Sequence, residues 1–245
     1  MINNNDIFLE SKFSLGNKIW LKLNKNVQKL ATKFQQISSL PYPLALLMAQ
    51  KGVDINQIEN FLDPKIKYSM PDPSLLLDID KAINIFIEAI NYKKKIAIFA
   101  DYDVDGGASA AMLYKWFENF QIEPTIYVPD RENEGYGPNI EAMTMLSLNH
   151  DLIICVDCGS TSPEPIASAR KNNCIVVVVD HHQGGDHKTK ADALVNPNRL
   201  DESSILSYLC AAGVTFLFLV AINRQLKKTD QKAPDILSYL DLVAL

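Results

Sequence analysis

The stretch IFADYDVDGG, residues 98–107, places three aspartates at alternate positions directly after an apolar run. The run begins at residue 96 and is apolar throughout, which is typical of a strand buried on both faces of a parallel sheet. The carboxylates of Asp101, Asp103 and Asp105 repel one another unless a cation or a proton offsets their charge. We therefore expect a metal site at the carboxyl end of a buried strand.

Four more short apolar runs follow the first, and segments with helical spacing of apolar residues lie between several of them. The five runs are residues 96–100, 125–128, 152–156, 175–179 and 193–195. Strands that alternate with helices predict a parallel sheet whose two faces are both covered. The predicted fold class is therefore α/β, a parallel sheet flanked by helices.

The first part of the chain lacks such runs and predicts helices. Residues 41–54 and 55–64 predict two short helices, and the proline-rich stretch 64–74 predicts a linker. We expect a helical N-terminal region with its linker over residues 1–78 and the sheet domain over residues 79–245.

The composition favours a protein with a large core outside the membrane. Hydrophobic residues make up 47% of the 245 residues, enough for a sizeable core. The longest apolar run, residues 209–222, is too short to span a bilayer and predicts a buried helix. The polar, acidic start MINNNDIFLE is not a signal peptide. A net charge of −5 gives no general attraction to nucleic acid, so contact with DNA would need a local basic groove.

Cysteine usage points to a reducing compartment. Cys155 and Cys158 form a single C-x-x-C, without the second pair that a zinc finger needs. We expect buried free thiols and a cytoplasmic location.

Acidic clusters follow three of the predicted strands. They are DYDVDGG after the first strand, DCGSTS (residues 157–162) after the third and DHHQGGD (residues 180–186) after the fourth. Ligand sites of parallel sheets lie at the carboxyl ends of the strands, so the three clusters are expected to meet at one edge.

Three kinds of site fit the aspartate stretch taken alone. A calcium-binding EF-hand loop needs a glutamate where Met112 stands. A phosphatase of the haloacid-dehalogenase type, with one aspartate as nucleophile, needs a threonine where Gly107 stands and leaves DHH unexplained. Aspartates with an imidazole can instead hold two divalent ions, Mn²⁺ or Mg²⁺, for phosphoester hydrolysis. Asp101 alternatively caps a helix.

Several ordered motifs resemble the DHH phosphoesterase family and, within it, the RecJ group of single-strand-specific 5′→3′ DNA exonucleases. DYDVDGG, VDCGS and VDHH are similar to the first three motifs of the family. The other similar stretches are VDINQIENFLDP, YVPDRENEGYGPN, LVNPNR, LCAAGVTFLFL and LDLVAL, so that the resemblance runs from about Leu44 to the end.

The resemblance implies a role for each matching residue. Those implied as metal ligands are Asp103, Asp105, Asp157 and His181, with Asp157 bridging two ions. His182 would act on the scissile phosphate as a catalytic group, with Asp101 as a supporting catalytic carboxylate and Asp180 orienting a ligand from behind. Arg131 and Asn198 are implied as substrate-binding or structural residues.

Two departures from the family pattern bear on activity. Phe99 stands where many members have a further histidine ligand. The chain also ends at Leu245, before the last aspartate ligand of the family and before the C-terminal substrate-binding domain. We therefore expect a truncated and impaired enzyme.

The implied function is metal-dependent hydrolysis of single-stranded DNA in recombination and repair. Single-stranded DNA would be the partner, and the resemblance adds a single-strand-binding protein and a RecQ-type helicase as further candidates. Two alternatives stay open: a phosphodiesterase or pyrophosphatase for small phosphate substrates, and an inactive fragment that only binds nucleic acid or a partner.

Overall fold

The computed structural model describes residues 7–8, 13–185 and 189–245. The chain forms two compact units, Met1–Met70 and Pro71–Leu245.

The first unit is helical, as the sequence predicts. Its helices are α1 (Lys25–Ser38), α2 (Tyr42–Gln50), α3 (Ile58–Leu62) and α4 (Ile66–Ser69), with a 3₁₀ turn, η3, at Ile55–Gln57. The small core of this unit is built around Phe34 of α1 and Met48 of α2, both fully buried. Asn24 starts α1 because its side chain accepts the backbone N–H of Asn26.

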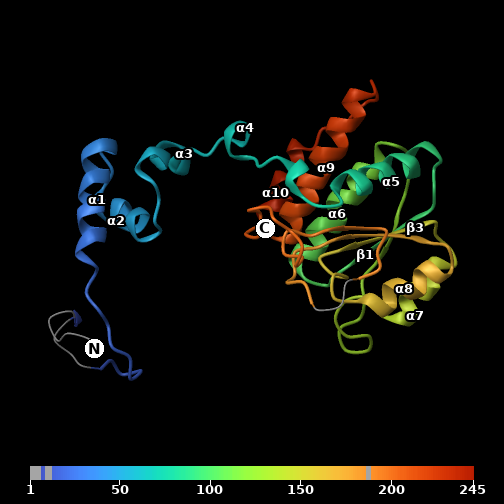
Figure 1. Cartoon of the computed structure of the whole chain (residues 1–245), viewed down its shortest axis with the longest axis horizontal. Helices are drawn as coiled ribbons and strands as arrows, with labels where there is room; N and C mark the ends of the chain where they lie inside the picture. The colour runs from blue at the N-terminus through green and yellow to red at the C-terminus, as the bar shows by residue number, and fades with distance from the viewer. Residues whose placement is uncertain (1–6, 9–12, 186–188) are drawn as a thin grey trace. The chain divides into compact units, whose positions relative to one another are not determined.

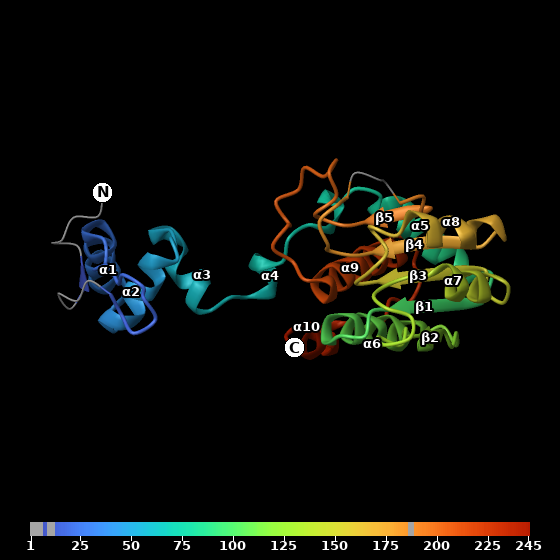
Figure 2. The same cartoon turned by 90° about the horizontal axis from the view of Figure 1, so that it is seen from below.

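The described part of the second unit contains one sheet of five parallel strands, which confirms the predicted fold class (Figure 1). The strands are β1 (Ile96–Ala100), β2 (Thr125–Tyr127), β3 (Leu152–Val156), β4 (Ile175–Val179) and β5 (Ala193–Val195). Figure 2 shows their order, β2-β1-β3-β4-β5. After β1 the chain adds β2 at one edge of the sheet and then crosses over to add β3 on the other side of β1. The carboxyl ends of β1 and β3 therefore form the topological switch point, where ligands bind in such sheets.

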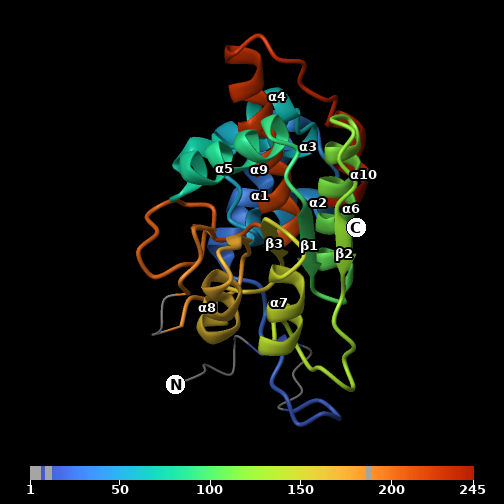
Figure 3. The same ribbon diagram turned by 90° about the vertical axis from the view of Figure 1, so that its right-hand side faces the viewer.

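Helices cover both faces of this sheet (Figure 3). The helices of one face are α5 (Ile79–Asn91), α6 (Val104–Glu118) and α9 (Ala211–Lys228), and those of the other are α7 (Ile140–Ser147) and α8 (Pro163–Lys171). Two 3₁₀ helices, η4 (Pro73–Leu75) and η5 (Leu237–Tyr239), and the short helix α10 (Leu240–Val243) also belong to the unit.

The core lies on both faces of the sheet, which explains the uninterrupted apolar runs of its strands. Under α5, α6 and α9, Phe86 packs edge-on against Phe218 at 4.6 Å and stacked on Phe117 at 5.4 Å, measured between ring centroids. The apolar run at residues 209–222 becomes the buried part of α9. Among the described residues, no helix is long and apolar enough to cross a membrane.

Candidate metal centre

The register of the strands aligns the polar residues that follow them. Ala100 of β1 is level with Val156 of β3, which is level with Val179 of β4. The next residues continue the ladder: the N–H groups of Asp101 and Asp157 donate to the carbonyl oxygens of Val156 and Val179. The predicted meeting of the acidic clusters at one edge thus follows directly from the pairing of the strands.

Asp103 starts α6 and turns its carboxylate toward the neighbouring acids. Its Oδ1 accepts the N–H groups of Asp105 and Gly106 at 2.9 and 3.1 Å. Although burial opposes it, these bonds and one with Asp157 hold the pKa of Asp103 below its ordinary value. The helix cap that the sequence offered to Asp101 therefore belongs to Asp103.

Asp101 lies buried beside this turn. Its Oδ1 has no hydrogen-bond partner among the described residues, and burial raises the pKa of its carboxyl group. Gly106 allows the close approach, because a Cβ there would lie 2.4 Å from the Asp101 carbonyl oxygen. A buried oxygen with free lone pairs is a suitable ligand for a hard cation.

Asp157 occupies the centre of the cluster in an unusual backbone conformation. Its φ of 58° lies in the left-handed region, which aspartate tolerates better than most residues. The residue is almost fully buried, and burial together with Asp105 and Asp103 raises the pKa of its carboxyl group to about 8. A cation at this position would offset the crowded charge.

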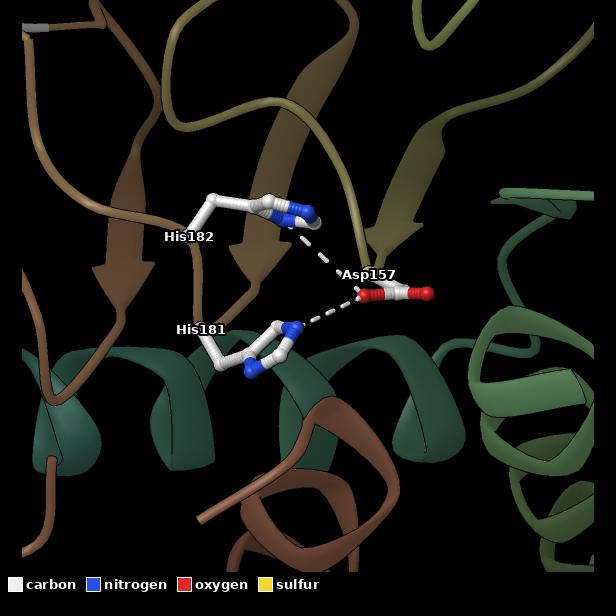
Figure 4. A group of neighbouring side chains, drawn as sticks. All are labelled: Asp157, His181 and His182. Atoms are coloured by element: carbon white, nitrogen blue, oxygen red, sulfur yellow. Dashed lines mark ion pairs between the residues drawn. The ribbon is translucent and has the colours of Figure 1, made fainter. Parts of the chain in front are cut away.

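The two histidines approach Asp157 from the end of β4 (Figure 4). His181 Nε2 lies 3.4 Å and His182 Nδ1 3.9 Å from Asp157 Oδ1. Behind them, Asp180 accepts the His182 ring N–H at 2.7 Å and the Ser160 backbone N–H at 3.0 Å. Although burial opposes it, these bonds lower the pKa of Asp180 to about 2, so it stays an anion behind the histidines.

Among the residues that the structure describes, two groups of side chains have ligand atoms close enough to hold a metal ion. One is Asp101, Asp103 and Asp157, and the other is Asp157, His181 and His182. Within each group the ligand atoms lie within 4.8 Å of one another, and Asp157 belongs to both. Mixed carboxylate and imidazole donors around buried, unpaired oxygens fit Mn²⁺ or Mg²⁺.

Asp105 has a second task besides the predicted metal ligation. Its two carboxylate oxygens accept the N–H groups of Ala211 and Ala212, at 2.7 and 2.6 Å, in the first turn of α9. Oδ2 also lies 3.8 Å from His181 Nε2. The carboxylate thus touches the cluster while it holds the start of α9.

The two predicted substrate residues differ in what they contact. Arg131 is exposed, and its guanidinium lies 5.4 Å from the centre of the Tyr102 ring. Asn198 donates from its side-chain amide to the carbonyl oxygens of His181 and Ser207. Arg131 is therefore presented to solvent beside the cluster, whereas the amide of Asn198 shapes the DHH turn.

Sequence reasoning missed two residues that support the histidines. Buried Asn196 donates to Ser160 Oγ at 2.7 Å and to the His182 carbonyl oxygen at 2.9 Å. The hydroxyl of Tyr136 lies 2.9 Å from His182 Nε2. Burial, aided by Asp180, raises the pKa of Tyr136, so its hydroxyl keeps its proton. In the sequence, the stretch NPN pointed to Asn196 and the stretch EGYG to Tyr136.

The other features of the aspartate stretch are part of the core. Phe99, at the position of the family histidine, is fully buried and stacks on Tyr127 at 5.3 Å between ring centroids. Met112 is fully buried in α6, so the position where an EF-hand needs a glutamate ligand belongs to the core. Cys155 and Cys158 are buried free thiols, as expected, and neither belongs to the two metal groups found in the described part of the chain.

Comparisons with known proteins identify the family of the chain. Residues 95–245 match the model of the DHH family, N-terminal domain. The single-stranded-DNA-specific exonuclease RecJ of Haemophilus influenzae is 32% identical over 190 residues, 75% of this chain and 33% of that protein. The chain spans about a third of the length of the curated relatives it matches.

Solved structures show the same fold. An exonuclease RecJ bound to manganese is 29% identical, with a TM-score of 0.60 over 69% of this chain and 42% of that one. RecJ of Thermus thermophilus with Mn²⁺ superposes over 91% of this chain and 30% of that one, at a TM-score of 0.69 and 24% identity. The structure of the same protein with Mg²⁺ superposes with a TM-score of 0.55 at 21% identity, over 91% of this chain and 27% of that one.

Proposed function

The chain belongs to the DHH family, and from this premise we propose that it hydrolyses phosphodiester bonds of single-stranded DNA from the 5′ end with the help of divalent metal ions. One observation carries the metal dependence: Asp157 is shared by two groups of ligand side chains at the switch point of the sheet. A carboxylate shared in this way suits a pair of ions.

Each residue of the cluster has a part in this function. Asp101, Asp103, Asp157 and His181 would hold the ions, and Asp105 would add to them from the start of α9. When bound, Mn²⁺ or Mg²⁺ activates water and offsets charge on the phosphoryl oxygens. Asp180 orients His182 toward the reacting phosphate, and exposed Arg131 offers a cation to the DNA backbone.

The substrate assignment rests on the relatives named above, whose names specify single-stranded DNA. From the resemblance of the motifs to the family, we also propose that the reaction serves DNA recombination and repair in the cytoplasm. Single-stranded DNA is the proposed partner, with a single-strand-binding protein and a RecQ-type helicase as further candidates. The buried free thiols fit a reducing compartment.

A direct test follows degradation of a 5′-labelled single-stranded oligonucleotide by the whole chain with Mn²⁺. We expect release of 5′ nucleotides, little cleavage of blunt duplex, and loss of activity in Asp157→Asn. Asp80→Asn, which changes an exposed aspartate on α5, is the matched control and should keep full activity.

Three results would contradict this function. Faster turnover of dinucleotides or pyrophosphate than of the oligonucleotide would favour the small-substrate phosphodiesterase. Binding of DNA without turnover would favour the inactive binding fragment. Activity that survives in Asp157→Asn would place the chemistry elsewhere.

A further inference from the structure

Both nitrogens of the His182 imidazole are engaged by protein side chains. Nδ1 lies 2.7 Å from Asp180 Oδ1, and the hydroxyl oxygen of Tyr136 lies 2.9 Å from Nε2 and 3.3 Å from Nδ1. Because Asp180 is an anion, its contact requires a proton on Nδ1. We therefore assign the neutral ring to the Nδ1–H tautomer, whose Nε2 can accept from the Tyr136 hydroxyl. The imidazole is thus held between an acidic residue and a tyrosine.

Asp180 is fixed independently of the ring that it holds. It is almost fully buried, and it accepts the backbone N–H groups of Ser160 and His181 at 3.0 and 2.7 Å. A single hydrogen bond to Asp180 nevertheless leaves the His182 ring free to tilt about that bond. Tyr136 supplies the second fixed point that defines the plane of the ring.

The loop that carries Tyr136 is itself held in place. Gly135 and Gly137, with φ of 84° and 73°, let the backbone turn on either side of the tyrosine. Just before this turn, the Glu134 carboxylate accepts the Tyr127 hydroxyl at 2.8 Å. The ring of Tyr136 is half exposed, while its hydroxyl points inward and also lies 3.3 Å from the Asp157 carbonyl oxygen.

We propose that Tyr136 is a positioning residue that, together with Asp180, fixes the imidazole of His182 for its work on the phosphate. The inference rests on the proposed function, in which His182 acts on the substrate. A ring held in one orientation before the substrate arrives needs no ordering during the reaction. Tyr136 therefore acts on turnover through His182.

The kinetic test replaces only the hydroxyl, in Tyr136→Phe. We expect kcat on single-stranded DNA to fall roughly 10- to 100-fold, a part of the about 10²–10⁴-fold effect of a well-placed proton-transferring group. KM should stay within about twofold, and so should Mn²⁺ binding at the group Asp101, Asp103 and Asp157, which does not contain His182. The matched control is Tyr114→Phe, in the C-terminal half of α6. It removes a hydroxyl that lies 3.4 Å from a carboxylate oxygen of Glu123, and it should leave kcat unchanged.

An unchanged kcat in Tyr136→Phe would overturn the inference. A raised KM at constant kcat would overturn it as well, because Tyr136 would then be a substrate contact.

A second measurement does not depend on activity. Side-chain ¹⁵N spectra of the whole chain should show the His182 imidazole in one tautomer, with its proton on Nδ1. In Tyr136→Phe the proton should stay on Nδ1, because Asp180 still accepts it, whereas the Nε2 resonance should shift because the contact with the hydroxyl is lost. The His150 signals should keep their positions. Identical His182 spectra in both proteins would refute the role of Tyr136. If the chain cleaves no DNA, the proposed function fails, yet the spectra still decide whether Tyr136 positions the ring.

Discussion

Asp157 combines two features that cost stability in a folded chain. Its backbone lies in the left-handed region, and its carboxyl group is buried against Asp103 and Asp105. Neither feature helps the packing of the sheet. A residue that is strained and electrostatically crowded at the switch point is typical of a binding site.

The raised pKa of Asp157 predicts how stability depends on pH. The folded carboxyl group titrates at about 8, whereas an unperturbed one titrates near 3.8. Between these values the native chain binds more protons than the unfolded chain. The free energy of unfolding should therefore decrease as pH rises from about 4 to about 8, and then level off.

Urea unfolding of the metal-free chain at pH 5, 6.5 and 8.5 measures this dependence. Saturating Mn²⁺ should remove much of the decline, because the ion replaces the proton. Asp157→Asn should be less pH-dependent than the unmodified chain without metal. A metal-free chain equally stable at pH 5 and pH 8.5 would show that the carboxyl group titrates normally.

The two adjacent glycines of the aspartate stretch predict opposite effects of the same substitution. Gly106→Ala places a Cβ 2.4 Å from the Asp101 carbonyl oxygen, so the backbone must move, at a cost of about 1–3 kcal/mol. Gly107→Ala adds a Cβ with nothing within 4 Å and should stabilise α6 by about 0.5–1 kcal/mol. Thermal melts of both variants test the pair. A stabilised Gly106→Ala would contradict the close approach to Asp101.

At the scale of elements, two helix N-termini meet at the cluster. Asp103 caps α6, and the carboxylate of Asp105 accepts the first amides of α9. A carboxylate is favoured at both places, because helix N-termini carry partial positive charge. The first motif therefore joins the metal cluster to α9, which packs on the same face of the sheet as α6.

Asp105→Ala should destabilise the chain even without metal. It removes two charge-assisted hydrogen bonds from the start of α9, and we expect a loss of about 1.5–3 kcal/mol. Hydrogen exchange at Ala211 and Ala212 should accelerate. Asp80→Ala, in the exposed first turn of α5, is the control and should cost only about 0.3–1 kcal/mol. Unchanged protection of these amides would make Asp105 a residue of the metal site alone.

The strands could be predicted closely, because a strand buried on both faces needs an uninterrupted apolar run. The expected runs at 96–100, 152–156, 175–179 and 193–195 match the observed strands. Helix α6 begins at Val104, inside the aspartate stretch, because Asp103 caps it. The hydrogen bonds of Tyr136 with His182 and of Asp105 with α9 join residues far apart in the sequence. Such contacts exist only after folding, and no local pattern encodes them.

At the scale of the whole molecule, all candidate site residues belong to the unit Pro71–Leu245. This unit has its own sheet, both helical layers and both metal groups. The sequence pattern placed the boundary after residue 78, whereas the compact unit begins at Pro71. The difference concerns the short segment 71–78.

Contacts within the unit tie this segment to the sheet and to α9. Asp72 accepts Arg224 Nη1 at 2.6 Å, and the N–H of Leu77 donates to Glu202 at 2.9 Å. Asp78 pairs with Arg199 at 3.0 Å. Leu76 lies between these contacts and is almost fully buried.

We therefore predict that a chain of residues 71–245 folds alone, and that one of residues 79–245 is less stable by about 2–4 kcal/mol. The shorter chain loses buried Leu76, worth about 1.5–3 kcal/mol, and the ionic hydrogen bonds of Asp72 and Asp78. Urea midpoints measure the difference, and both chains should bind Mn²⁺ when folded, because neither metal group uses the segment. Equal midpoints would place the boundary after residue 78, because residues 71–78 would then add nothing to the fold that holds the metal cluster.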